Sequence, residues 1–184
     1  MHLRRDKTIY HLTMTAAAAA ALCVLSPWSV PLGPVPISLC TLLIYLSAWL
    51  FSPGRAVAAV GVYVLVGAAG LPVFSGFLGG LGRLAGPTGG YIVSYLPLAA
   101  ICAGFVRRFP GRRGVQFLGM VLGTAVLYAV GTGWFCIQTQ VGVVGGLTAC
   151  VLPFLPGDAV KIAAALLLGP VLRSRLERSG LLYE

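Results

Sequence analysis

Charge is scarce in this 184-residue chain. Asp, Glu, Lys and Arg together make up 9% of it, and only four residues are acidic, whereas 58% are hydrophobic. Soluble domains carry about 25% charged residues. This composition excludes an ordinary soluble protein, and we expect an integral membrane protein.

The residue types of common active sites are also scarce. The two histidines, His2 and His11, lie near the N-terminus, and the chain has no HExxH motif, no phosphate-binding loop and no pair of carboxylates spaced for acid–base catalysis. The five cysteines are scattered through apolar segments without a CxxC motif. No ring of repeated polar groups indicates a channel. We expect no catalytic residue, no metal site and no cofactor.

Apolar segments recur along the chain, and a membrane helix needs about 20 mostly apolar residues. The pattern predicts an all-α integral membrane protein with six transmembrane helices in one domain, residues 1–184. The expected helices cover 9–26, 37–51, 56–70, 90–106, a fifth that starts near 115 and loses regularity around 131–133, and 158–172. The stretch 141–152 is short and glycine-containing, as in a half-inserted segment. The first segment also fits a signal peptide, although we favour a retained helix.

Most of the Lys and Arg residues fall on one side of this arrangement. With the N-terminus inside, six helices place eleven of the thirteen on the inner side: Arg4, Arg5, Lys7, Arg55, Arg107, Arg108, Arg112, Arg113, Arg173, Arg175 and Arg178. Inner loops of membrane proteins are rich in Lys and Arg. We therefore expect a multi-pass protein of a prokaryotic plasma membrane with both termini in the cytoplasm. The net charge of +9 then needs no nucleic acid partner.

An unbroken alanine run, 16–21, occupies the centre of the first segment. Ala16 and Ala20 share one helix face, as do Ala17 and Ala21, and small faces let membrane helices approach closely. We expect these four alanines to bind a partner helix. The alternative is that they face lipid.

The stretch 71–91 reads LPVFSGFLGGLGRLAGPTGGY. Its glycines forbid one continuous helix, since each interior glycine costs about 1 kcal/mol relative to alanine. It is too apolar for a solvated linker, with Phe74, Phe77 and the single charge Arg83. We expect an ordered outer loop, between the third and fourth helices, that covers an apolar ligand; a plain connector is the alternative.

Three charges remain outside the inner side: Arg83, Asp158 and Lys161. Ionisable residues in membrane segments are costly and mark functional sites. Asp158 and Lys161 are three residues apart, hence neighbours on a helix. The alternative is a self-neutralising ion pair in which Asp158 caps the helix. In the second segment the hydroxyls of Ser38, Thr41 and Ser47 either turn inward or bond to their own helix backbone.

Four stretches in order, VPISLCTLL (35–43), GLPVF (70–74), GGLGRLAGPTGGY (79–91) and PFLPGDAVK (153–161), resemble the BioY family, the biotin-specific S components of energy-coupling factor (ECF) transporters. The resemblance covers nearly the whole chain, and GPTGGY followed by PGDxxK is specific. Cys40 stands where the family pattern has glutamine, and Arg83 occupies a variable position of that pattern.

The resemblance implies six membrane helices in lipid, a vitamin site near the outer surface and a covering loop. It also implies a transmembrane coupling protein and two cytoplasmic ATPases as partners. Asp158 and Lys161 match polar ligand contacts of the family, and Tyr91 ends its glycine motif. The expected ligand-binding residues are Asp158, Lys161, Tyr91, Arg83, Phe74, Phe77, Gly79, Gly80, Thr88 and Gly89.

The expected function is high-affinity capture of biotin without covalent chemistry. Asp158 is expected to accept from the ureido N–H groups, and either Lys161 or Arg83 is expected to meet the ligand carboxylate. An S component for another vitamin and a small membrane enzyme are the alternatives.

Overall fold

The computed structural model describes residues 2–30 and 35–180, with side chains from Ile9 onward. The elements in order are α1 (His2–Leu25), β1 (Ser29–Val30), β2 (Ile37–Ser38), α2 (Cys40–Leu50), α3 (Pro53–Ala68), α4 (Leu81–Ala85), α5 (Gly89–Arg108), α6 (Arg113–Thr139), α7 (Val143–Cys150) and α8 (Leu155–Arg178).

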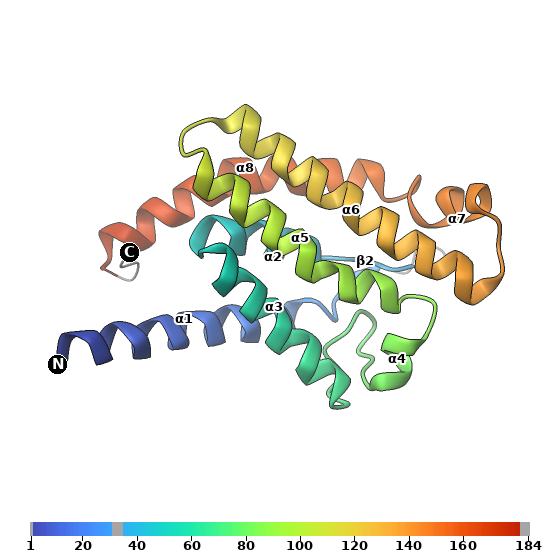
Figure 1. The fold of residues 1–184 in the computed structure, drawn as a ribbon, viewed down its shortest axis with the longest axis horizontal. Helices are drawn as coiled ribbons and strands as arrows, with labels where there is room; N and C mark the ends of the chain where they lie inside the picture. Colours follow the sequence, from blue (N-terminus) through green and yellow to red (C-terminus); the bar gives the residue numbers. More distant parts are fainter. Residues whose placement is uncertain (1, 31–34, 181–184) are drawn as a thin grey trace.

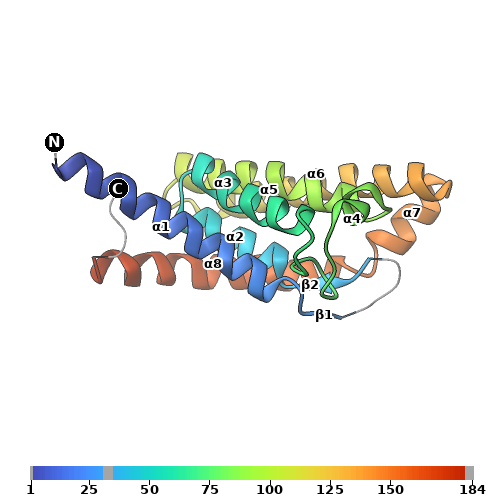
Figure 2. The same ribbon diagram turned by 90° about the horizontal axis from the view of Figure 1, so that it is seen from below.

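The long helices run roughly along one axis, and the start of α1 and the end of α8 lie at the same end of the bundle (Figure 1). The short helices α4 and α7 lie at the opposite end. Seen from the side, α3, α5 and α6 form one layer, and α8 lies below them (Figure 2). Helix α2 contacts both α5 and α8, so it joins the two layers. Its core-facing residues include the fully buried Ile44 and Tyr45.

Helices α5 and α6 form the most extensive helix pair because glycines of α6 let the backbones approach. A side chain at Gly119 would collide with the Phe105 ring, and one at Gly131 would collide with the Tyr91 ring. Glycine lowers helix propensity, so the sequence predicts a loss of regularity around 131–133. That expectation is wrong, since α6 is unbroken through these residues; packing on α5 outweighs the propensity.

Three of the described helices, α5, α6 and α8, are long and apolar enough to cross a membrane. The apolar part of α1 (Ile9–Leu25), α2 and α3 are shorter apolar helices. The second expected helix begins later than 37, because Ile37 and Ser38 pair with Val30 and Ser29 in an antiparallel ribbon. The short apolar stretch after α6 forms α7.

Residues 69–88 connect α3 to α5 and contain α4. The Gly80 N–H donates to the Gly67 carbonyl of α3 (2.7 Å), and the Gly76 N–H donates to the Pro27 carbonyl (2.9 Å). Gly80 has a φ of +92° and Gly76 a φ of +78°, a region that glycine adopts at no steric cost. The segment is therefore tied both to α3 and to the chain between α1 and β1.

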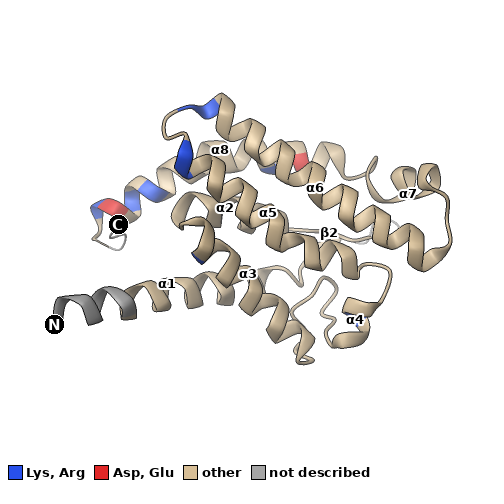
Figure 3. Ribbon diagram, in the orientation of Figure 1, with Lys and Arg blue, Asp and Glu red and all other residues tan. Residues whose placement is uncertain are grey.

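Lys and Arg gather at the end of the bundle where α1 begins and α8 ends, around the α5–α6 connection and along the last turns of α8 (Figure 3). The side chains of Arg4, Arg5 and Lys7 lie outside the described ones. Arg83 belongs to α4, at the opposite end. The Lys and Arg residues of the α5–α6 connection and of the end of α8 thus lie at one end of the bundle, and Arg83 lies at the other.

Candidate ligand-binding site

A polar cluster links three helices around Asp158, whose residue surface is 6% exposed. Its Oδ1 accepts from Lys161 Nζ at 3.0 Å and from the Thr41 hydroxyl at 3.4 Å. Its Oδ2 accepts from the Tyr128 hydroxyl at 2.5 Å. Lys161 also donates to Thr41 Oγ1 at 3.1 Å. Thr41 comes from α2, Tyr128 from α6 and the ion pair from α8, so side chains far apart in sequence meet here.

Asp158 lies in the first turn of α8, where the helix dipole favours a negative charge. Phe154 precedes the first residue of that helix, and no side chain caps it. The Asp158 carboxylate bonds across helices instead, which argues against the capping role. The ion pair with Lys161 does form. Because Thr41 and Tyr128 also donate to the Asp158 carboxylate, the pair is part of a larger network.

This cluster opens into a hollow, which we call the Asp158 hollow. It has about 380 Å³ of atom-free space, which includes space open to solvent. Its lining residues are Val35, Pro36, Ile37, Ser38, Thr41, Tyr91, Tyr95, Leu127, Tyr128, Cys150, Phe154, Asp158 and Lys161.

A second hollow of about 360 Å³ adjoins the first, and we call it the Arg83 hollow. Its lining residues are Val35, Pro36, Tyr63, Phe74, Ser75, Arg83, Thr88, Tyr91, Ile92 and Tyr95. The two hollows share Val35, Pro36, Tyr91 and Tyr95. Together they form a trough with an acid–base pair at one end and an arginine at the other.

Two polar groups of the Arg83 hollow have no partner among the described residues. The Thr88 hydroxyl is buried without a hydrogen bond there, and none of the described side chains pairs with the Arg83 guanidinium. A buried polar group such as the Thr88 hydroxyl nearly always has a partner in a folded protein, whereas Arg83 is half-buried. This end of the trough is therefore suited to a ligand that brings an acceptor, such as a carboxylate.

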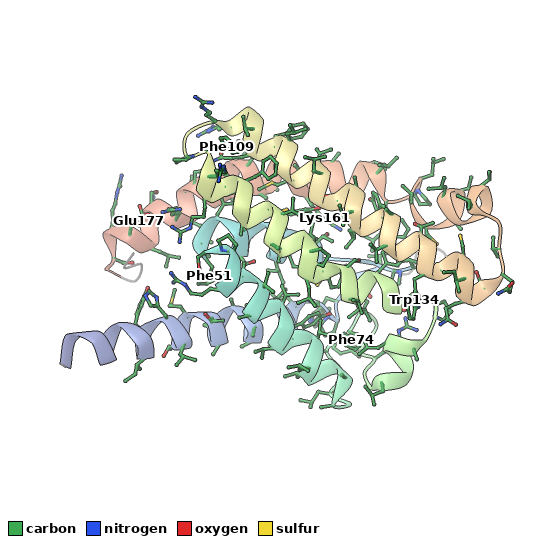
Figure 4. The ribbon with its side chains drawn as sticks, viewed as in Figure 1. Phe51, Phe74, Phe109, Trp134, Lys161 and Glu177 are labelled. Carbon is green, nitrogen blue, oxygen red and sulfur yellow. The ribbon has the colours of Figure 1, made fainter. Side chains whose placement is uncertain are left out.

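Two side chains of α6 hold α4 over this hollow. Trp134 Nε1 donates to the Gly86 carbonyl (2.9 Å), and Gln138 Nε2 donates to the Ala85 carbonyl (3.0 Å). These carbonyls belong to the end of α4, where backbone acceptors lack helical partners. Figure 4 shows Lys161 inside the bundle, with Trp134 and Phe74 nearer the end where α4 lies. The position of Arg83 thus depends on contacts made by α6.

Comparisons with known proteins show which family the chain belongs to. A family model described as the BioY family matches residues 2–178. The chain belongs to the BioY family. A probable biotin transporter BioY of Pyrococcus horikoshii is 34% identical over 157 residues, which cover 85% of this chain and 92% of the relative. The biotin transporter BioY of Thermotoga maritima is 35% identical over 155 residues, 83% of this chain and 90% of that one.

A solved structure, the S-component for biotin from an ECF-type ABC transporter, superposes with a TM-score of 0.85 at 26% identity. The superposition covers 92% of this chain and 93% of the chain in the solved structure. The family consists of transporter components, which confirms that the protein is not an enzyme. Family membership and the apolar helices make it a multi-pass membrane protein of a prokaryote.

The ligand-binding residues expected from the sequence fall into two groups. Asp158, Lys161 and Tyr91 line the Asp158 hollow, and Tyr91, Phe74, Arg83 and Thr88 line the Arg83 hollow. Phe74 is buried against Tyr63, with ring centroids 5.6 Å apart.

Phe77 and three glycines line neither hollow. Phe77 is 55% exposed and packs edge-on against Trp28 at 5.6 Å. A side chain at Gly79 would collide with the backbone of Leu71, and one at Gly89 with the backbone of Leu84. Gly80 has the positive φ noted above. Their places in the fold are explained by backbone geometry, and contact with a ligand remains a prediction for them.

Sequence reasoning missed Tyr128 and Tyr95, although a tyrosine within an apolar segment is a signal that could have found them. Tyr95 follows Tyr91 by one helical turn and so shares its face. For Thr41 the sequence allows two interpretations, and its contacts with the ion pair show that it turns inward. Ser47 follows the second interpretation and bonds to its own helix backbone, since its hydroxyl donates to the Ile44 carbonyl. Cys40 is fully buried and lines neither hollow.

Proposed function

We propose that this protein is the biotin-capturing S component of an ECF transporter and binds biotin in the trough formed by the two hollows. The observation that carries the proposal is a chain-long relation to biotin transporters combined with polar groups at both ends of the trough. No covalent chemistry takes place, and no cofactor takes part.

Biotin matches the trough in chemistry. Its cyclic urea carries two N–H donors and a carbonyl acceptor, its ring body is apolar, and its side chain ends in a carboxylate. Asp158 accepts from a urea N–H, and Lys161 donates to the urea carbonyl; charged partners make such bonds about twice as strong as neutral ones. Tyr91, Tyr95 and Phe74 cover the apolar part.

The ligand carboxylate lies at the Arg83 end. Arg83 and Thr88 are the groups there without a partner among the described residues, whereas Lys161 already bonds to Asp158 and Thr41. An arginine guanidinium also matches a carboxylate geometrically. These observations favour Arg83 over Lys161 as the partner of the carboxylate.

The glycine-rich segment between α3 and α5 is the outer lid of the trough. Its contacts with α3, with Pro27 and with α6 support a covering position. Six helices, α1, α2, α3, α5, α6 and α8, span the membrane in one domain, with both termini in the cytoplasm and lipid around the exposed apolar side chains. A transmembrane coupling protein and two cytoplasmic ATPases complete the transporter.

The proposal predicts that biotin co-purifies with the protein in mild detergent. Mass spectrometry of the extracted ligand should detect biotin. Titration of biotin into the emptied protein should show saturable binding, and desthiobiotin, which has the same urea and carboxylate, should compete with biotin. Recovery of another vitamin, with no biotin binding, would support the alternative S component.

The topology predicts opposite labelling at the two ends of the bundle. Arg112→Cys, in the α5–α6 connection, should stay unlabelled by an impermeant maleimide added to intact cells. Val144→Cys, on an exposed position of α7, should be labelled, and the parental chain gives the background from the native cysteines. Labelling of Arg112→Cys from outside would contradict cytoplasmic termini.

A further inference from the structure

The Asp158 carboxylate is held from two directions. Lys161 and Thr41 donate to Oδ1, and Tyr128 donates to Oδ2. A carboxylate offers about four lone-pair sites, so three donors leave about one site, on Oδ2 beside the Tyr128 hydroxyl. A ligand N–H that meets Asp158 without displacing these donors therefore meets it there.

Tyr128 is the one described residue shown to donate to Oδ2. The terminal torsion of an aspartate has broad minima, so a carboxylate anchored through Oδ1 alone retains freedom to turn. The hydroxyl of Tyr128 removes that freedom and fixes Oδ2 at the wall of the Asp158 hollow.

Tyr128 and Asp158 also line a crevice between α6 and α8. This crevice, about 570 Å³ of atom-free space between α6 and α8, is lined mainly by apolar residues: Phe117, Val121, Thr124, Ala125, Tyr128, Leu155, Asp158, Ala159 and Ile162. A carboxylate that turned toward this crevice would lie in apolar surroundings, which is costly for a charge. The bond from the Tyr128 hydroxyl to Oδ2 adds to this preference for the trough.

We propose that Tyr128 is a positioning and specificity-determining residue, which keeps Asp158 facing the trough as an acceptor and so selects ligands that present an N–H at that point. The inference rests on the proposed function, since it takes the cyclic urea as the group that is recognised. A site built to bond an N–H discriminates strongly against an analogue that lacks it, provided that the acceptor is fixed.

The chain offers a matched control one helical turn away. The Tyr45 hydroxyl bonds to Thr124 Oγ1 at 2.6 Å, and Thr124 precedes Tyr128 by four residues on α6. Thr124 donates to the Met120 carbonyl, so Tyr45 is the donor in its bond. Tyr45 is fully buried. Tyr45→Phe thus removes a buried tyrosine hydroxyl of α2 that bonds to α6 one turn before Tyr128, and Tyr45 lines neither hollow.

The test titrates biotin, and biotin methylated at its ureido nitrogens, into the purified full chain. Tyr128→Phe keeps the ring, so the wall between trough and crevice stays closed. It should raise the Kd for biotin about five- to tenfold, as for one lost hydrogen bond, and lower the Kd ratio between methylated and unmodified biotin by a similar factor. In the Asp158→Asn background it should change the Kd for biotin less than about twofold, because it acts through that carboxylate. Tyr45→Phe should lower thermal stability and leave both Kd values within about twofold of wild type.

Three results would overturn the inference: an unchanged or lower Kd for biotin in Tyr128→Phe, an unchanged ratio between the two ligands, or an equal loss of affinity with Asn at position 158. Wild-type protein that binds no biotin would instead overturn the proposed function, and the inference with it. The two failures are therefore distinguishable from the wild-type titration alone.

Discussion

Asp158→Asn should weaken biotin binding by about one to two orders of magnitude. Asparagine keeps the size of the side chain and its acceptor toward Lys161 and Thr41. It loses the charge and presents an amide N–H₂ toward Tyr128 or the trough, where the ligand N–H needs an acceptor. Loss of a hydrogen bond to a charged group costs about 1.5–3 kcal/mol, and 1.4 kcal/mol corresponds to a tenfold change in Kd.

Stability has to be separated from affinity in this variant. Asp158 and Lys161 form a largely buried ion pair at 3.0 Å, with side chains 8% and 13% exposed, and removing one partner of such a pair leaves an uncompensated charge. The ligand-free variant should therefore unfold at a lower temperature. Titration well below that midpoint keeps the protein folded, so that a higher Kd reports the lost contact.

Glu177→Gln is the matched control for the change from carboxylate to amide. Glu177 accepts from Arg173 at 2.8 Å near the end of α8 and is exposed, far along the helix from Asp158. Its Kd for biotin should equal that of wild type. A wild-type Kd in Asp158→Asn would show that the aspartate serves only the packing of α2, α6 and α8.

The sequence predicts the rare features of this chain best. Asp158, Lys161 and Arg83 stand out because a charge in an apolar chain is costly and therefore needs a reason. All three line the trough. The sequence also predicts that the other described Lys and Arg residues lie apart from these three, because membrane topology depends on where positive charges lie.

Features that depend on tertiary contacts were beyond the sequence. Phe74 and Phe77 lie three residues apart in one loop, yet Phe74 is buried and Phe77 is exposed. The difference comes from the turn between them, where Gly76 and Phe77 both have positive φ. Tyr128 is one of seven tyrosines, and only the approach of α6 to α8 singles it out as a partner of Asp158. Local pattern carries no information on which helix faces which.

The four alanines of α1 differ in exposure and in whether they line a groove within the chain. Ala16, Ala17 and Ala20 are exposed, and Ala21 is half-buried. Ala17 and Ala21 line an apolar groove over α2, so their side chains also bear on packing within the chain. Ala16 and Ala20 lie outside that groove, and they give the cleaner test of a partner-binding face.

Ala16→Leu and Ala20→Leu should abolish assembly with the coupling protein and the ATPases, and reduce biotin uptake to background. The physical reason is that a close helix–helix contact between small residues has no room for a larger side chain. Both positions are exposed in the isolated chain, so leucine fits there without a clash, and the Kd for biotin should stay at the wild-type value. Co-purification with the tagged coupling protein measures assembly, and titration of the isolated chain measures binding.

Ala129→Leu is the control, because Ala129 is an exposed alanine on the long apolar helix α6, away from α1. It should assemble and transport like wild type. Normal assembly of Ala16→Leu and Ala20→Leu would place this alanine face against lipid. If assembly is intact but biotin binding is lost, these alanines instead support the fold of the ligand site. A leucine on a free outer face would not disturb the trough between α2, α5, α6 and α8.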